Sequence, residues 1–344
     1  MPYQDCIWSS SVPETEEVAS TVKMLDTVDS TNSLIARAVA ASGFSDAVNC
    51  VAHLFESPED IGEGEGEGEG TDTDRRVVGI QTPASSDHGS ESSSERSERL
   101  PISIAVSDVQ TKCRGRQGRT WFNSPGESLL SSWAVPVRID VLDSRHSGWF
   151  TTICGIALID AIGEVMTRHD VRALNPDVQL ELKWPNDVFC QGRKLAGILC
   201  EMVPTDESSA VLIIGIGMNL FVPQENLPID MSTSLQLQFG PLPPYAELRD
   251  ELVCVTTQHL RRELSAFMKH PDVVIPDLRD RVERLSWTLG KQVRAHLADD
   301  RSLIGRALSI NDDASLTILR HDGCRQKVTV ADVGVLPEIG DAVE

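Results

Sequence analysis

Three apolar segments between residues 178 and 220 constrain the fold more than any other feature of the chain. They are VQLELKW (178–184), KLAGILCEMV (194–203) and AVLIIGIGMNL (210–220). Each has the length and the Val, Ile and Leu content of a β-strand, and only short polar turns separate them. Parallel neighbours would need a long crossover, so this close succession favours antiparallel pairing. The chain is therefore expected to form a sheet that is antiparallel in this region.

Periodic patterns elsewhere predict further elements. Strands are expected at 100–109 and 128–137, and helices at 29–43, 147–166, 244–268 and 276–286. Ser30 or Thr31 can cap the first of these helices, and Gly43 can end it. From about residue 288 the pattern changes to short strands separated by D-D and D-G turns, which is typical of a small SH3-like β-barrel. The predicted fold class is α+β, a mixed β-sheet with helices followed by this C-terminal barrel.

Residues 57–99 form a Gly-, Glu- and Ser-rich insertion with few core-forming side chains. Such a segment buries too little apolar surface to offset the entropy of ordering it, so we predict that it is disordered. Its twelve acidic and four basic residues contribute −8 of the formal net charge of −21. The predicted organisation is an N-terminal tail (1–25), a main domain (26–286) containing this insertion, and the barrel (287–344).

Charge, apolar runs and cysteine spacing argue against several classes of protein. A sequence pI near 4.7 argues against general affinity for DNA or for an anionic membrane. The longest apolar run, at 211–218, is too short to cross a bilayer. The eight cysteines are scattered without zinc-ligand spacing, and the N-terminus has no signal-peptide pattern. We therefore expect a cytoplasmic protein with reduced thiols, and the sequence suggests neither metal ligands nor an oligomeric state.

The stretch CRGRQGRTW (113–121) stands out because it places three arginines within six residues of an acidic chain. No acidic side chain falls between Asp108 and Glu127. Glycines at 115 and 118 allow the backbone to approach a ligand closely, and arginine guanidiniums suit carboxylate and phosphate oxygens. Taken alone, the stretch could equally be a solvated basic turn.

Three other short motifs have similar pairs of interpretations. Lys183 ends a strand before the turn Pro185-Asn186-Asp187, where it is either a solvent-facing lysine or a cation that points into a site. Gly197 in KLAGILCE either leaves room for a ligand or allows close strand packing. Asn219 ends GIGMNL, where its amide either holds a ring or caps a turn.

Taken together and in order, these motifs resemble those of the biotin protein ligases. The resemblance rests on DSTN (29–32), Q-T-x-x-R-G-R-Q-G-R-x-W (110–121), KWPND-V (183–188), RKLAGIL-x-E (193–201) and GIGMNL (215–220). It extends over roughly 26–56 and 100–336, including the barrel. It implies an ATP-dependent ligase that makes biotinyl-5′-AMP from biotin and Mg-ATP. The biotinyl group would then pass to a lysine of a biotin carboxyl carrier protein or domain.

The resemblance also implies roles for individual residues. As catalytic residues it implies Lys183, Arg114 and Arg116. As biotin-binding residues it implies Ser30, Thr31, Asn32, Gln110, Arg114, Gly115, Arg116, Lys183 and Gly197. As ATP-binding residues it implies Arg119, Trp121, Lys183 and Asn219. A second, polar loop at 221–231 is expected to cover the adenine.

The chain departs from the family pattern in two places. Cys113 replaces the glycine that usually opens the arginine stretch, so a positive φ there would be strained. The surrounding cations could also favour its thiolate and make it sensitive to oxidation, the alternative being a buried, inert thiol. Second, only about 25 residues precede the motifs, from which we expect a ligase without DNA-binding repressor function.

Two alternatives remain open on sequence grounds. One is a lipoate or octanoyl protein ligase, which shares a lysine and an acyl-adenylate strategy but not the arginine signature. The other is a catalytically silent biotin-binding or adaptor protein that uses the barrel as its contact surface. Pyrophosphate release on addition of biotin or of lipoate would distinguish these possibilities.

Overall fold

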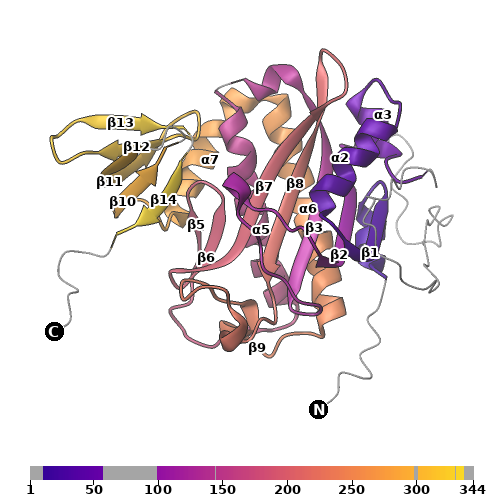
Figure 1. Ribbon diagram of the computed structural model, residues 1–344, viewed down its shortest axis with the longest axis horizontal. Coiled ribbons are helices and arrows are strands. Elements are labelled where there is room, and N and C mark those ends of the chain that lie inside the picture. The colour runs from indigo at the N-terminus through magenta and orange to yellow at the C-terminus, as the bar shows by residue number, and fades with distance from the viewer. Residues whose placement is uncertain (1–10, 57–98, 144, 298–300, 330, 337–344) are drawn as a thin grey trace.

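The computed structural model describes residues 11–56, 99–143, 145–297, 301–329 and 331–336. A seven-stranded mixed sheet with helices on both faces forms the body of the molecule, and a five-stranded sheet lies at one end of it (Figure 1). This arrangement confirms the predicted mixed sheet with helices followed by a separate C-terminal β-unit. The predicted insertion at 57–99 lies, except for residue 99, outside the described residues.

The strands of the large sheet follow the order β1-β2-β3-β8-β7-β6-β5. Their bounds are β1 (Val22–Val28), β2 (Ser103–Gln110), β3 (Ser128–Arg138), β5 (Leu180–Lys183), β6 (Asp187–Cys190), β7 (Arg193–Pro204) and β8 (Ser209–Asn219). Only β1 and β2 pair in parallel, and every other pair in this sheet is antiparallel. The sequence patterns missed β6, which lies between the predicted strands at 178–184 and 194–203, so those two strands are not neighbours.

Six α-helices are described, and the labels follow Figure 1. Their bounds are α1 (Pro13–Val18), α2 (Thr31–Ala41), α3 (Ala47–Ala52), α5 (Ser147–Arg168), α6 (Tyr245–Lys269) and α7 (Pro271–Leu285). Four short 3₁₀ turns are η1 (Arg116–Gly118), η2 (Ile139–Leu142), η3 (Gln224–Asn226) and η4 (Leu235–Leu237). The helix expected from residue 276 begins earlier, at Pro271, where a proline suits the first helical turn.

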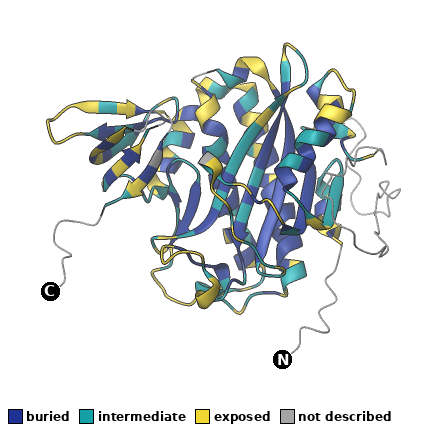
Figure 2. Ribbon diagram, in the orientation of Figure 1, coloured by how far each residue is buried: buried dark blue, intermediate teal, exposed yellow. Residues whose placement is uncertain are grey.

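The two faces of the large sheet carry separate cores, and its strands β3 and β8 are mostly buried (Figure 2). Side chains such as Trp133, Ile214 and Ile216 face α5 and α6. On the opposite face Ala134 and Ile213 pack with α2 and α3. Because strand residues alternate between faces, Gly215 and Gly217 lie on the α2 face. The α2 face therefore has a stretch of β8 without side chains, next to the helices that cover the rest of it.

Helix α5 is the one helix among the described residues that is long and apolar enough to span a bilayer, judged by length and composition. Its most apolar window is 72% buried inside the fold. Its apolar side chains belong to the core between the sheet and α6, which accounts for its composition.

The N-terminal prediction needs correction. Residues 13–18 form α1, and residues 22–28 form the edge strand β1, so a tail that ends at residue 25 would cut β1. The carboxylate of Asp250 on α6 accepts hydrogen bonds from the backbone N–H groups of Glu14 and Thr15. A buried carboxylate at a helix N-terminus satisfies backbone donors that would otherwise be unpaired, and it holds α1 against α6.

The C-terminal sheet contains β10 (Gln292–His296), β11 (Ser302–Ile310), β12 (Leu316–Leu319), β13 (Arg325–Val328) and β14 (Asp332–Val335). All its pairs are antiparallel, in the order β13-β12-β11-β10-β14. Two indole N–H groups attach it to the body: Trp149 donates to Asp312 O and Trp184 to Ala314 O. A two-stranded sheet of β4 (Arg172–Ala173) and β9 (Phe239–Gly240) completes the described elements.

Candidate active site

A cavity of about 460 Å³ opens on the α2 face of the sheet, over β7 and β8. Its walls are the arginine loop (residues 113–121), the N-terminus of α2, the turn between β5 and β6, and the later part of the loop after β8. A volume of this size suits a small-molecule ligand. Three arginines and one lysine line it, whereas Asp187 is its one acidic lining residue in the described part of the chain. The cavity is thus locally cationic in an acidic protein.

The arginine loop is a tight hairpin closed by its own backbone. Trp121 N–H donates to Cys113 O, and Gly115 N–H donates to Arg119 O at 2.6 Å. Gly118 has a φ of +71°, which a residue with a Cβ rarely adopts. The backbone hydrogen bonds hold the loop in one shape, so its guanidiniums project from a fixed base.

Glycines on β7 and β8 make room for two side chains on the floor of the cavity. A Cβ at Gly217 would lie 2.9 Å from the indole of Trp121, and one at Gly197 would lie 3.1 Å from it. A Cβ at Gly215 would lie 2.3 Å from Asn32 Oδ1. The space beside Gly197 is therefore occupied by Trp121, although Gly197 does line the cavity as predicted.

The polar end of the cavity is a hydrogen-bonded cluster around the N-terminus of α2. Ser30 caps the helix, because its Oγ accepts from Ser33 N–H. Gln110 donates to Thr31 Oγ1 at 3.2 Å. Ser132, which the sequence patterns missed, places its Oγ 2.6 Å from both Thr31 Oγ1 and Asn32 Oδ1, within hydrogen-bonding distance of each. The structure thus brings together the predicted residues Ser30, Thr31, Asn32 and Gln110.

Asp29 fixes the start of this cluster. Its carboxylate makes a two-pronged pair with Arg37, at 2.8 and 2.9 Å, and accepts from Ser30 N–H. The hydrogen bond from Arg37 is the main cause that lowers the pKa of Asp29, so the carboxylate stays ionised. The pair holds the DSTN turn from outside the cavity, since neither Asp29 nor Arg37 lines it.

Glu201 on β7 joins the polar end to the arginine loop. One carboxylate oxygen accepts from Asn32 Nδ2 at 2.8 Å and from Arg114 at 2.9 Å. This glutamate ends the RKLAGIL-x-E motif (193–201), and the sequence alone assigns it no role. The contact places Arg114 against the α2 cluster.

The turn Asn186-Asp187, which follows a cis Trp184–Pro185 bond, gathers three cations. Arg116 donates to Asn186 Oδ1 at 3.0 Å. The carboxylate of Asp187 lies 3.6 Å from Lys183 Nζ and 2.8 Å from Lys194 Nζ. Asp187 is buried, so it holds both ammonium groups at the edge of the cavity.

Lys183 and Lys194 occupy different positions relative to the cavity. Lys183, from β5, stands behind Asp187 and lines a small adjoining pocket rather than the cavity itself. Lys194, from β7, lines the cavity and lies over the Trp121 ring at 5.4 Å. Lys194 was not among the predicted site residues, although it stands in the RKLAGIL motif.

Three of the four predicted nucleotide residues line the cavity, and the fourth, Lys183, does not. Trp121, Arg119 and Asn219 all line the cavity. The buried indole N–H of Trp121 has no hydrogen-bond partner among the described residues, so it can donate to a ligand. Asn219 donates to Thr233 O at 2.9 Å, which ties the end of β8 to the segment after the second loop. From that loop, predicted at 221–231, Pro228 and Ile229 line the cavity.

The structure decides two questions about Cys113: whether its backbone is strained and whether its thiol is reactive. It is not among the residues with positive φ, so the missing glycine causes no strain there. Burial raises the pKa of its thiol to about 11, so the neighbouring arginines do not make it a thiolate. The alternative of a buried, inert cysteine fits the structure, and the oxidation hypothesis does not.

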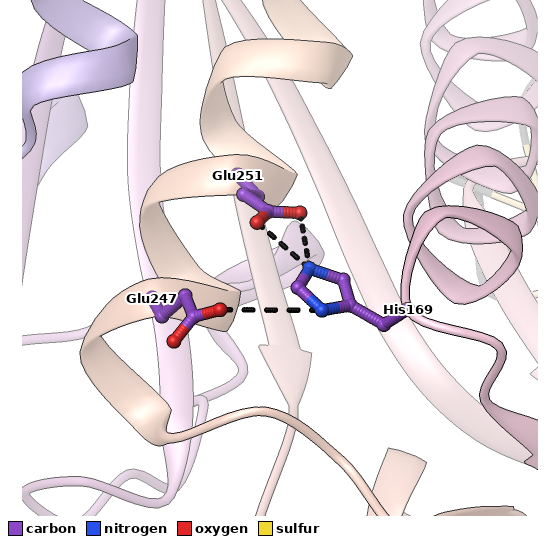
Figure 3. Close-up of side chains that lie close together, drawn as sticks. All are labelled: His169, Glu247 and Glu251. Atoms are coloured by element: carbon purple, nitrogen blue, oxygen red, sulfur yellow. Dashed lines mark hydrogen bonds and ion pairs between the residues drawn. The ribbon is translucent and has the colours of Figure 1, made fainter.

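Another cluster, His169, Glu247 and Glu251, lies between the end of α5 and the start of α6 (Figure 3). Both carboxylate oxygens of Glu251 point at His169 Nε2, at 2.7 and 2.8 Å, while Glu247 lies 4.0 Å from Nδ1. The two glutamates thus approach opposite edges of the ring, which is the geometry of an ion pair between helices. None of the three lines the cavity.

Comparison with known proteins shows similarity to one family. The model of the biotin/lipoate A/B protein ligase family matches residues 91–219, which include the arginine loop, the Asn186-Asp187 turn, and β7 and β8. The chain is 28% identical over 215 residues to a biotin--[acetyl-CoA-carboxylase] ligase of Mycobacterium tuberculosis, covering 62% of this chain and 72% of that protein. Residues 91–219 thus match the biotin/lipoate A/B protein ligase family.

Two further matches show how far the similarity extends. A bifunctional ligase/repressor of Bacillus subtilis is 26% identical over 233 residues, 67% of this chain and 65% of that protein. A biotin protein ligase from Aquifex aeolicus, solved in complex with biotin and ATP, matches at a TM-score of 0.52 and 21% identity. That match covers 68% of this chain and 88% of the other, and it supports the fold.

Proposed function

We propose that the protein is an ATP-dependent biotin protein ligase, which forms biotinyl-5′-AMP and transfers biotin to a lysine of a biotin carboxyl carrier domain. One observation carries the proposal: Arg116, Lys183 and Lys194 converge on the Asn186-Asp187 turn beside the floor of the cavity. The similarity to named biotin ligases supports the choice of substrate.

In the first step an oxygen of the biotin carboxylate attacks the α-phosphorus of ATP, and pyrophosphate leaves. Both reactants are anions, so they repel each other as they approach. Cations held in fixed positions offset this repulsion and stabilise the charge that develops on the phosphoryl oxygens. Arg114, Arg116 and Lys183 take this role in the proposal, with Arg119 near the phosphates.

The polar and apolar parts of the cavity suit the two ends of biotin. Ser30, Thr31, Asn32 and Gln110 offer hydroxyls and amides to a ureido ring, and Ser132 and Glu201 orient them. The aliphatic tail would run along the cavity-lining residues Ile198 and Leu199 of β7, since Trp121 fills the space beside Gly197. Trp121 and Asn219 would flank the adenine. Hydrogen-bonding groups buried at one end reject ligands that lack matching partners.

Mg²⁺ enters the proposal with the nucleotide. Asp187 is the one carboxylate among the described lining residues, and two lysines already hold it. Phosphate oxygens and water are ordinary ligands of Mg²⁺ in nucleotide sites, so the protein need supply few. The ion would neutralise charge on the phosphates as pyrophosphate departs.

In the second step the acceptor amine, after losing its proton, attacks the acyl carbon and AMP leaves. The mixed anhydride is sensitive to water, so the arginine loop and the loop at 221–231 would shield it until the acceptor arrives. The acceptor is proposed to be a carrier protein or domain of a biotin-dependent carboxylase. The proposed compartment is the cytoplasm.

The test is an incubation with ATP, Mg²⁺ and a biotin carboxyl carrier domain, with either biotin or lipoate added. The proposal predicts pyrophosphate release with biotin and a mass gain of one biotinyl group on a single carrier lysine. Pyrophosphate release with lipoate alone would identify a lipoate ligase. Tight biotin binding with no pyrophosphate would identify a silent binding protein.

A further inference from the structure

Lys194 belongs to the group of cations at the Asn186-Asp187 turn, but neither the sequence motifs nor the proposed reaction steps give it a ligand of its own. Its Nζ lies 2.8 Å from Asp187 Oδ1 and 5.4 Å from the centre of the Trp121 ring. A Cβ built on Gly197 would lie 3.3 Å from that Nζ, so the ammonium also sits close above β7. Its side chain is 28% exposed, and it lines the cavity.

The backbone of Lys194 is the attachment point of the segment that follows the second loop. Its N–H donates to Met231 O at 2.7 Å, and its carbonyl accepts from Thr233 N–H at 2.9 Å. The carbonyl oxygen of Thr233 in turn accepts a hydrogen bond from the side-chain amide of Asn219, which also lines the cavity. One residue therefore carries a charge into the cavity through its side chain and holds the base of the loop through its main chain.

The position of this ammonium also defines what it can bind. Asp187 neutralises it only in part, because the same carboxylate lies within 3.6 Å of Lys183. Because two lysines share this one carboxylate, its negative charge does not fully offset the positive charge of Lys194, which lines the cavity. The charge lies beside Trp121, the residue proposed to flank the adenine. An anionic group attached to the nucleoside fits this place.

We propose that Lys194 is a nucleotide-positioning residue, which binds a phosphate oxygen of ATP and through its backbone bonds holds the loop at 221–233 over the nucleotide. This rests on the proposed function only in taking ATP as the nucleotide. Binding moves the ammonium from the face of Trp121 toward the phosphate, which frees that face for the adenine ring.

The experiment compares wild type with Lys194→Met, Lys194→Arg and the exposed neighbour Arg193→Met. Isothermal titration measures the affinities for ATP, adenosine and biotin, each added alone. The proposal predicts that Lys194→Met weakens ATP binding by about ten- to a hundredfold, as expected for loss of a charged hydrogen bond. Adenosine and biotin should bind within twofold of wild type. Lys194→Arg should recover most of the ATP affinity, and Arg193→Met should match wild type.

Two results would overturn the inference. One is an equal loss of affinity for ATP and for adenosine in Lys194→Met, which would show that Lys194 does not bind a phosphate. The other is unchanged ATP affinity in Lys194→Met. A variant that simply unfolds would lose biotin affinity as well, and its thermal midpoint would fall below that of Lys194→Arg. If wild type releases no pyrophosphate with biotin, the proposed function fails, while the comparison of ATP with adenosine still decides the role of Lys194.

Discussion

Replacing Gly215 by alanine tests whether Asn32 forms part of the ligand site. The new Cβ would lie 2.3 Å from Oδ1 and 2.9 Å from Cγ of Asn32. A carbon and an oxygen approach to about 3.3 Å, so the amide must retreat by roughly 1 Å. That retreat lengthens the bonds from Ser132 at 2.6 Å and to Glu201 at 2.8 Å beyond hydrogen-bonding distance.

The magnitude follows from these two bonds. Asn32 is only 4% exposed, so water does not replace the lost partners. Two buried hydrogen bonds at about 1 kcal/mol each lower the free energy of unfolding by about 2 kcal/mol. The displaced amide also loses one hydrogen bond to biotin, about 1.4 kcal/mol, which weakens biotin binding about tenfold.

The assay is urea unfolding together with isothermal titration of biotin without nucleotide. Gly163→Ala is the matched control, because Gly163 is exposed on α5 and a Cβ there meets nothing within 4 Å. Loss of backbone freedom in the unfolded chain should make this control about 0.5–1 kcal/mol more stable, with unchanged biotin binding. In an Asn32→Ala background, Gly215→Ala should add less than about 0.5 kcal/mol. Wild-type biotin affinity in Gly215→Ala would refute the placement of Asn32 in the site.

Three other perturbations have defined outcomes. Lys183→Ala should lower the rate of biotin-dependent pyrophosphate release about a hundred- to a thousandfold, and a wild-type rate would make Lys183 a surface lysine. Because burial raises the pKa of Cys113 to about 11, its alkylation should be slow at neutral pH and should speed up until about pH 11; a plateau near pH 8.5 would contradict this. The lowered pKa of Asp29 means that its pairing with Arg37 stabilises the fold above the unfolded-state pKa of about 3.9, and that this stabilisation is lost as pH falls through the folded-state pKa. The difference in unfolding free energy between wild type and Arg37→Met should therefore shrink on acidification, and a constant difference from pH 7 to pH 3 would be the contrary result.

Most elements of the fold could be predicted because they depend on local patterns. The apolar runs of β7 and β8 and the buried length of α5 are legible in the sequence without any neighbour. β6 was missed because it has only four residues, Asp187–Cys190. Such a short strand directly after a turn shows no periodicity that distinguishes it from the turn. β1 was missed because its partner β2 begins 75 residues further along the chain, so its role as an edge strand depends on a distant pairing.

The site was predictable in its motifs and less so in its contacts. Arg116 and Lys183 were chosen for their charge, and both do meet at the Asn186-Asp187 turn. Ser132 and Lys194 looked ordinary because their roles arise from the strand register and from the loop packed onto β7. The sequence left Cys113 either as a reactive thiolate or as a buried, inert thiol, because burial, which sequence does not show, determines its pKa.

The central claim is that fixed cations around the Asn186-Asp187 turn bring the biotin carboxylate and the α-phosphate of ATP together. A crystal structure with biotin and a non-hydrolysable ATP analogue tests it directly. The account predicts the biotin ring at Thr31 and Asn32, the adenine at Trp121, and the carboxylate and α-phosphate within reach of Arg116 and Lys183. Both ligands bound elsewhere, with the arginine loop facing solvent, would contradict it.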